Sequence, residues 1–275
     1  MKKYYLFIAL AMVAVMNVSR KNNKKAEASE ADAEVVEAAK TVLADDVLAT
    51  IDEFAKIYTD ENNFFDVPKF ITSCLSEEEK MIKPDYLLDP ASTSELITKS
   101  QKVAALAILC LEKSIRTAYG MPGEASAEAI ERLCAELNYP LANDDFKDLK
   151  ASDRIRQFYE ICKESGELAS FWQFNFVVIN ELAYLISQNP DIFFRNITEE
   201  QFATFYTRYK SCYAAVKEIA NYDEEVAAAL KALEENRCVS SSEESAKAYG
   251  SLANAKRTMT NSKEVYAARR AALLK

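Results

Sequence analysis

The chain has 275 residues, a formal net charge of −9 at pH 7 and no histidine. Without histidine it cannot form a serine–histidine or cysteine–histidine nucleophile pair, an imidazole base, or a histidine-ligated zinc or haem site. Only four glycines argue against many hairpins or a phosphate-binding glycine loop, whereas the strong helix formers alanine, glutamate, leucine and lysine are abundant. We therefore predict an all-α protein, a single multi-helix bundle of about nine helices, with an α-helical array as the alternative.

The N-terminus has the pattern of an export signal. Two lysines precede an apolar run over residues 4–16, which has the length of a signal-peptide core and is short for a membrane span. Basic residues follow the run, and the nearest small-residue cleavage pattern is Ala26-Glu27-Ala28. We predict that residues 1–28 are a signal peptide or an N-terminal anchor with a basic linker. The anchor, over residues 4–18, would lie in the inner membrane.

Residues 29–275 are predicted to form one helical domain. Ser29 begins a helix whose apolar positions recur at helical spacing as far as Tyr58. The next region, residues 59–90, contains three prolines, and we expect it to be irregular except for one short helix that begins at the capping box of Ser76 with Glu79.

Capping patterns also predict the central helices. Ser92 and Glu95 form a second capping box, which predicts the start of a long helix that ends at Gly120. A short helix follows before Pro140. Asn143 is then predicted to cap a helix that continues through Cys162 and ends near Gly166.

The stretch over residues 167–188 is the most apolar of the domain, and it predicts a helix at the centre of the bundle. Polar side chains within this stretch recur at helical spacing on one side. Because buried amides and phenols need hydrogen-bond partners, such a polar stripe either contacts neighbouring helices or lines a ligand pocket. The candidate pocket residues are Trp172, Gln173, Asn180, Glu181 and Tyr184.

Four further helices are expected towards the C-terminus. Thr198 and Gln201 form a capping box that begins one of them, and apolar spacing predicts another over residues 226–233. The last two are predicted over residues 242–259 and after Asn261.

The C-terminal residues 246–275 carry seven basic residues and one acidic residue, whereas the preceding body is strongly acidic. The basic C-terminal helix either docks on that body or contacts an anionic surface or partner. An acidic body disfavours nucleic-acid binding, so no nucleic-acid partner is predicted.

Three aspartates, Asp144, Asp145 and Asp148, are similar to the DDxxD pattern with which all-helical terpenoid synthases hold the magnesium ions of a diphosphate. The second metal motif of those enzymes is incomplete here and comes before the first, the reverse of their order. The simpler interpretation is that Asn143 caps a helix and that the aspartates complement its positive end. We keep the three aspartates as weak metal candidates and predict no cofactor.

Six cysteines are spread along the chain without a CxxC pair. Four of them continue apolar helical stripes, which favours buried thiols; the alternative is at least one disulfide between neighbouring helices. The six positions are Cys74, Cys110, Cys134, Cys162, Cys212 and Cys238.

These patterns favour a non-enzymatic helical protein, exported to the bacterial periplasm or cell surface, that binds or scaffolds a partner at the envelope. No catalytic residue is predicted. Two alternatives remain: a magnesium-dependent enzyme that works with carboxylates alone, including Glu181, and a carrier that holds an apolar small molecule around Trp172. The expected partner is accordingly an envelope protein or a small apolar ligand.

Overall fold

The computed structural model describes residues 43–143, 146, 149–239 and 242–275, and these residues form α-helices and short 3₁₀ helices without a β-strand. The α-helices are α2 (Asp45–Thr59), α3 (Val67–Ser73), α4 (Glu77–Met81), α5 (Lys99–Ala118), α6 (Glu124–Leu137), α8 (Ala151–Ser165), α9 (Leu168–Gln188), α10 (Pro190–Asn196), α11 (Glu199–Ile219), α12 (Glu224–Glu235), α13 (Ser242–Ala248), α14 (Leu252–Asn261) and α15 (Lys263–Leu273). The 3₁₀ helices are η1 (Glu61–Asn63), η2 (Pro90–Glu95) and η3 (Pro140–Ala142). The all-α class is confirmed.

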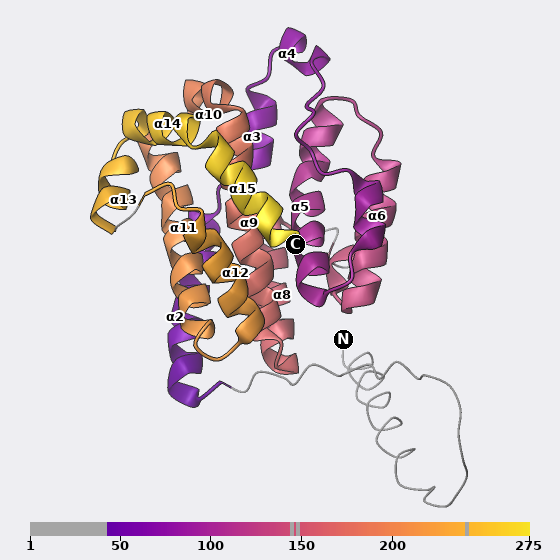
Figure 1. Ribbon diagram of the computed structural model, residues 1–275, viewed down its shortest axis with the longest axis vertical. Helices are drawn as coiled ribbons and strands as arrows, with labels where there is room; N and C mark the ends of the chain where they lie inside the picture. Colours follow the sequence, from indigo (N-terminus) through magenta and orange to yellow (C-terminus); the bar gives the residue numbers. More distant parts are fainter. Residues whose placement is uncertain (1–42, 144–145, 147–148, 240–241) are drawn as a thin grey trace, which may run out of the picture. The chain divides into compact units, whose positions relative to one another are not determined.

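Helix α9 lies at the centre of the bundle, as its sequence predicts (Figure 1). Eighteen of its 21 residues are buried. Phe171 and Trp172 are fully enclosed, and such a side chain contributes about 1.5–3 kcal/mol when it leaves water. The helix contacts α3, α5, α8, α10, α11, α12, α14 and α15. Because one helix contacts so many others, the architecture is a bundle and not an array in which each unit contacts its sequence neighbours.

Two groups of helices cover α9 on different sides. Helices α2 and α11 pack along each other on one side (Figure 1), and α8 contacts both α2 and α9. On another side, α5 packs against α9 and carries α6 on its outer face. The short helix α3 contacts both α5 and α9. The apolar faces of these helices therefore converge on α9.

The C-terminal helices close the bundle. Helix α15 crosses α9 and also contacts α5 and α12 (Figure 1). The predicted single helix over 242–259 is wrong: α13 ends at Ala248, and α14 begins after the N-cap Ser251, whose side chain accepts a hydrogen bond from the backbone N–H of Asn254. Gly250 is a weak helix former at this break.

The capping boxes place some helix starts correctly and one wrongly. The boxes at Ser76 and Thr198 are present as predicted. The box predicted at Ser92 is wrong, because Pro90–Glu95 forms the 3₁₀ helix η2 and α5 begins after Thr98, which forms its own capping box with Gln101. Helix α5 stops at Gly120, which has a φ of +57° that favours glycine.

The helix predicted from Asn143 through Cys162 is interrupted. Asn143 follows η3 and Phe146 is helical, but Leu149 and Lys150 are not, and α8 begins at Ala151. The cap predicted at Asn143 adjoins residues 144–145, which lie outside the described residues. The helix predicted from Ser29 is described from Asp45 onwards, as α2.

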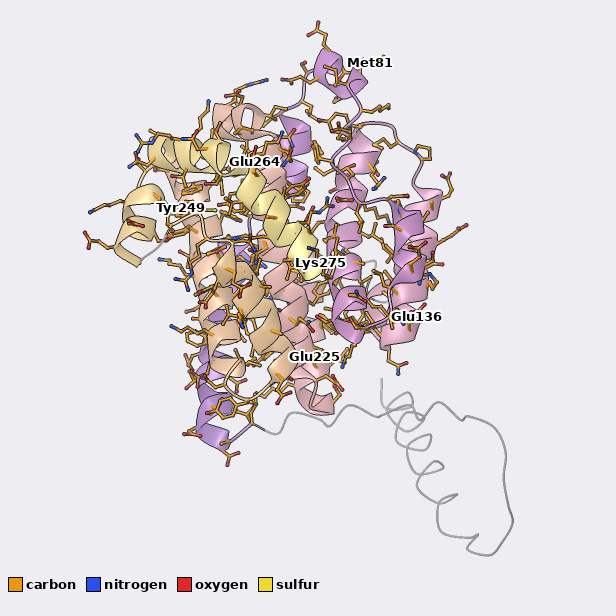
Figure 2. The ribbon with its side chains drawn as sticks, in the orientation of Figure 1. Met81, Glu136, Glu225, Tyr249, Glu264 and Lys275 are labelled. Atoms are coloured by element: carbon orange, nitrogen blue, oxygen red, sulfur yellow. The ribbon has the colours of Figure 1, made fainter. Side chains whose placement is uncertain are left out.

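Helix α4 stands outside the core. None of its residues is buried, and Met81 at its end is 79% exposed and extends away from the bundle (Figure 2). The packing that positions a site therefore comes from the other helices.

Candidate functional site

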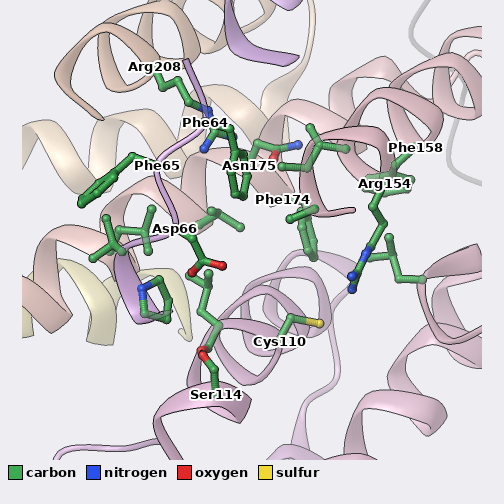
Figure 3. A pocket seen from close by; sticks show the side chains of 18 residues that line it. Phe64, Phe65, Asp66, Cys110, Ser114, Arg154, Phe158, Phe174, Asn175 and Arg208 are labelled. Carbon is green, nitrogen blue, oxygen red and sulfur yellow. The ribbon is translucent and has the colours of Figure 1, made fainter. Parts of the chain in front are cut away.

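A cavity of about 280 Å³ lies between α5, α8, α9, α11 and the segment that leads into α3. Aromatic rings form much of its wall (Figure 3), with Phe64 and Phe65 from the segment, Phe158 from α8 and Phe174 from α9. Its volume is roughly twice that of the ~150 Å³ cavity that suffices for benzene. The cavity therefore has room for a small, mainly apolar molecule.

A buried cation, Arg208 of α11, contributes to the wall of this cavity. Its side chain lies against two aromatic faces, 4.4 Å from the ring centroid of Tyr58 and 4.8 Å from that of Phe64. Its Nε donates to the Tyr58 carbonyl at 3.0 Å.

The charge of Arg208 is not neutralised within the described part of the chain. The residue is 6% exposed, forms no ion pair with a described residue, and its Nη2 has no hydrogen-bond partner there. Burying an unpaired charge is costly, and an anion in the cavity would offset that cost. Arg208 is therefore the chemical centre of the candidate site.

The other polar groups at the wall already have partners. Asp66 caps α3 by accepting from the backbone N–H of Lys69 at 3.0 Å. Asn175 accepts from the Tyr58 hydroxyl and donates to the Phe171 carbonyl, both at 2.8 Å. Burial raises the pKa of Tyr58 well above its usual value, so the phenol remains a neutral donor.

A second arginine and a thiol complete the polar part of the wall. Arg154 of α8 donates from Nη2 to the Leu149 carbonyl at 3.2 Å, and its Nε has no hydrogen-bond partner among the described residues. Burial raises the pKa of Cys110 to about 12, so this thiol is neutral. Together with Asp66, the two arginines leave one excess positive charge on an otherwise neutral wall.

The candidate pocket residues from the sequence all lie on α9 but in different surroundings. Trp172 is fully buried against Tyr58, with ring centroids 5.5 Å apart, and the Nε2 amide of Gln173 donates to Ser100 Oγ at 2.5 Å. Asn180 lines a separate groove beside α11 and donates to the Phe176 carbonyl at 2.7 Å. Trp172 is not among the residues that line the central cavity.

The remaining two, Glu181 and Tyr184, belong to a buried cluster of charged groups. Glu112 of α5 and Glu181 of α9 are 0% and 1% exposed, and Arg270 of α15 forms ion pairs with both. Arg270 Nε lies 2.9 Å from Glu181 Oε2, and its guanidinium stands 4.6 Å above the Tyr184 ring. The structure thus brings Glu181 and Tyr184 together around Arg270.

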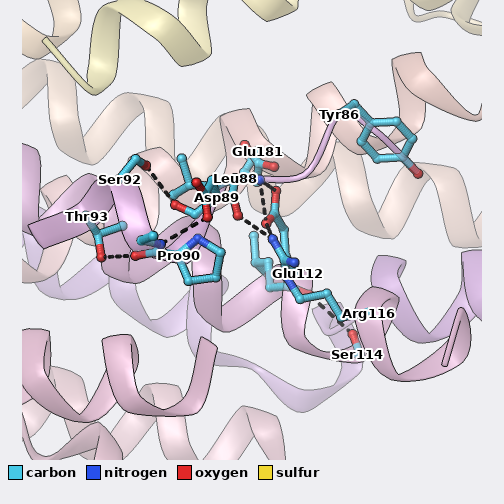
Figure 4. A network of polar contacts seen from close by, with 12 residues as sticks. Tyr86, Leu88, Asp89, Pro90, Ser92, Thr93, Glu112, Ser114, Arg116 and Glu181 are labelled. Atoms are coloured by element: carbon cyan, nitrogen blue, oxygen red, sulfur yellow. Dashed lines mark hydrogen bonds and ion pairs between the residues drawn. The ribbon is translucent and has the colours of Figure 1, made fainter. Parts of the chain in front are cut away.

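The chain between α4 and η2 closes this cluster. Glu112 accepts the backbone N–H of Leu88 at 3.0 and 2.9 Å (Figure 4). Arg116 donates to the Leu88 carbonyl and also to Glu112, the latter at 3.2 Å. Arg270 Nη1 donates to the Tyr86 carbonyl at 2.7 Å. The formal charges of Glu112, Glu181, Arg116 and Arg270 sum to zero when both carboxyls are ionised, and we refer to these four residues as the charge cluster.

The pKa of Glu181 is raised to about 8: burial raises it most, Arg270 lowers it, and the nearby charge of Glu112 also raises it. The pKa of Glu112 is also raised by burial, against lowering by Arg270, the Leu88 N–H and Arg116. The charge cluster therefore holds a proton on its carboxyl pair near neutral pH. Its contacts join α15 to α5 and α9.

Parts of the basic tail are docked on the body in this way. Arg270 contacts two buried glutamates, Lys256 pairs with Asp191 of α10 at 2.7 Å, and Arg269 donates to the Asn236 carbonyl at 2.7 Å. Lys263 is exposed and makes no such contact with a described residue.

The metal candidates Asp144, Asp145 and Asp148 lie outside the described residues. Among the residues that are described, no group of three or more cysteine, aspartate or glutamate side chains is arranged to hold a metal ion. All six cysteines are described and are free thiols, with Cys134, Cys162 and Cys212 buried. No helix in the described ranges is both long and apolar enough to cross a membrane.

Sequence reasoning missed Arg208, although a signal was present. Phe205, Arg208, Cys212 and Ala215 recur at helical spacing on α11, so the arginine interrupts a buried apolar stripe. Phe64 and Phe65 were missed because they lie in a non-helical segment with no periodic pattern.

The sequence matches no protein-family model, and neither a curated protein nor a solved structure is similar to the chain.

Proposed function

We propose that the protein is a binding protein whose central cavity takes a small amphipathic carboxylate. The observation that carries this proposal is the buried Arg208, whose charge has no described partner and whose surroundings are aromatic. A carboxylate would pair with the guanidinium, while its apolar part would fill the space between the aromatic rings. This proposal resembles the carrier alternative of the sequence analysis, but it places the ligand beside Arg208 and not around Trp172.

The volume of the cavity sets the size of the ligand. A benzene molecule has six non-hydrogen atoms, so a cavity twice as large holds about twelve. Decanoate has this size, and a longer acyl chain would have to leave part of its length in water or displace a helix. We therefore expect affinity to rise from hexanoate to decanoate and to fall by hexadecanoate.

The proposal also includes the location of the protein in the cell. The basic start and the apolar run over residues 4–16 support export to the bacterial periplasm or cell surface. Mass spectrometry of the protein recovered from separated cell fractions tests this: we expect an exported form that lacks the first residues up to about Ala28. A full-length chain in the cytoplasmic fraction would contradict it.

Binding is tested by calorimetric titration of the purified protein with the acid series and with decanol. We expect decanoate to bind at least about tenfold more tightly than decanol, because Arg208 recognises the charge. Arg208→Met should remove that preference, whereas Arg208→Lys should retain part of it. Arg156→Met is the control, because it removes an arginine that does not line the cavity. The Arg156 side chain is 52% exposed and pairs with Asp153 of the same helix.

A second variant keeps the test independent of the contacts that Arg208 makes in the fold. Val178 lines the cavity, and Val178→Phe would fill space without removing a polar contact. We expect this variant to stay folded and to lose decanoate binding. Equal binding of decanoate and decanol by the native protein, or unchanged binding by Val178→Phe, would overturn the proposal.

A further inference from the structure

A second hollow lies beside α11, and residues of α9, α12, α13 and α15 contribute to its wall. Figure 1 shows where these helices lie. Its volume is about 570 Å³, twice that of the central cavity, and it shares no lining residue with that cavity. We refer to it as the tyrosine groove, after Tyr206, Tyr209 and Tyr213 of α11.

The three tyrosine rings form an ordered row. Their planes are nearly parallel, at 12° between Tyr206 and Tyr209 and 6° between Tyr209 and Tyr213, with centroids 6.2 and 6.4 Å apart. Two hydroxyls are held in place: that of Tyr213 donates to Glu234 at 2.8 Å, and that of Tyr206 is 3.2 Å from Ser245 Oγ. The groove thus offers fixed aromatic surface next to polar groups.

Positive charge accumulates along the groove although the whole chain is acidic. Lys210, Lys217, Arg237 and Arg269 line it, and Glu234 is the acidic residue among the described lining residues. The two lysines are exposed and form no ion pair with a described residue, whereas Arg237 pairs with Glu234 at 3.0 Å. Lys210 Nζ lies 5.0 Å from the centroid of the Tyr206 ring, and neither lysine is neutralised by a described carboxylate.

The spacing of these cations indicates an elongated ligand. Lys210 and Lys217 are seven residues apart on one helix face, which is about 10 Å along the axis, and the row from Tyr206 to Lys217 covers about 16 Å. An elongated ligand that contacts both lysines carries negative groups separated by a neutral part. A short oligosaccharide with carboxylate sugars has this pattern and this length.

The polar side chains that remain in the wall suit hydroxyl groups. Asn180 is 5% exposed, and since its Nδ2 is used by the Phe176 carbonyl, its amide oxygen is the end that is left for a ligand donor. Glu234 also accepts hydroxyl hydrogen bonds but repels phosphate. A nucleic acid, with its dense row of phosphates, fits this wall less well because Glu234 lies among the cations that line it.

We propose that the tyrosine groove binds a short acidic oligosaccharide: its carboxylates would pair with Lys210 and Lys217, and its pyranose rings would pack against Tyr206, Tyr209 and Tyr213. This site is independent of the central cavity, so a ligand in one leaves the other free.

The test is a calorimetric titration of the purified protein with hexasaccharides of galacturonate, of alginate and of hyaluronan. Methyl-esterified galacturonate and a single-stranded oligonucleotide of similar length serve as comparisons. We expect at least one acidic hexasaccharide to bind, the methyl ester to bind about tenfold more weakly, and affinity to fall with added salt.

The double variant Lys210→Met/Lys217→Met should weaken that binding at least about tenfold and leave decanoate binding unchanged. The matched control is Lys231→Met/Lys263→Met, which removes the same charge at two exposed lysines outside the groove. The proposal is overturned if none of the three hexasaccharides binds, if the oligonucleotide binds more tightly, or if both double variants lose affinity equally.

Discussion

Replacing Arg270 by methionine tests the charge cluster most sharply. The variant keeps a long apolar side chain but leaves Glu112 and Glu181, which are 0% and 1% exposed, with Arg116 as their one remaining cation in the charge cluster. Removing one partner of a buried ion pair typically costs about 3–5 kcal/mol, because the other charge remains buried. For a domain of this size, that loss corresponds to a fall of about 6–20 °C in the melting temperature.

The assay is urea unfolding at pH 8 together with hydrogen exchange of α15. We expect Arg270→Met to lose stability and to expose the α15 amides, because Arg270 joins α15 to α5 and α9. Adding Glu181→Gln to the variant should restore much of the loss, since Glu112 and Arg116 then remain as a pair. Arg257→Met, at an exposed α14 position, is the control and should change stability by less than about 0.5 kcal/mol. A loss below about 1 kcal/mol for Arg270→Met would refute the reasoning.

Three further outcomes are expected. The pKa of Glu181 is raised to about 8 in the folded protein from a usual 4.5, so between these pH values the folded protein holds a proton that the unfolded chain loses. The contribution of Glu181 to the free energy of unfolding is therefore full below about pH 4.5 and is lost as pH rises to about 8. Glu181→Gln should flatten that decline in urea unfolding measured from pH 5 to pH 9, and an unchanged slope would argue against the raised pKa. Thr98→Ala should cost about 1 kcal/mol by removing the cap of α5, while Ser92→Ala should cost little; the reverse order would favour the helix start predicted from the sequence. Gly120→Ala should cost about 1–2 kcal/mol in thermal unfolding, because the φ of Gly120 is +57°. Gly123→Ala is the control and should be neutral, because Gly123 has a negative φ and open space around it. Equal effects of the two substitutions would contradict the conformational argument.

The central position of α9 could be predicted because its pattern is local. A helix that is apolar on nearly every side must be enclosed by others, and the run from Phe171 to Ile186 has this property. The capping boxes at Ser76 and Thr198 were equally readable, since a cap depends on side chains three residues apart.

The start of α5 could not be chosen by the same rule. Ser92 with Glu95 and Thr98 with Gln101 both fit the capping pattern, and the structure uses the second. Pro90 at the first position of η2, together with the Thr93 hydroxyl bonded to the Pro90 carbonyl, stabilises a 3₁₀ turn before the helix begins.

The candidate site was harder to predict because its residues are distant in sequence. Arg208 stacks on Tyr58 and Phe64, which lie about 150 residues earlier in the chain, and no local pattern joins them. Glu181 was selected as a buried polar residue of α9, but its partner Arg270 belongs to the basic tail, which the sequence connects to the body only through its overall charge. Tertiary contacts of this kind follow from the packing of the helices and not from their individual patterns.

The most direct test of the central proposal is a crystal structure of the protein grown with decanoate. We predict density for one ligand between the rings of Phe64, Phe158 and Phe174, with its carboxylate within hydrogen-bond distance of the Arg208 guanidinium. A structure in which the cavity is filled by rearranged protein side chains, or in which decanoate lies elsewhere while Arg208 pairs with a carboxylate of the chain, would contradict it.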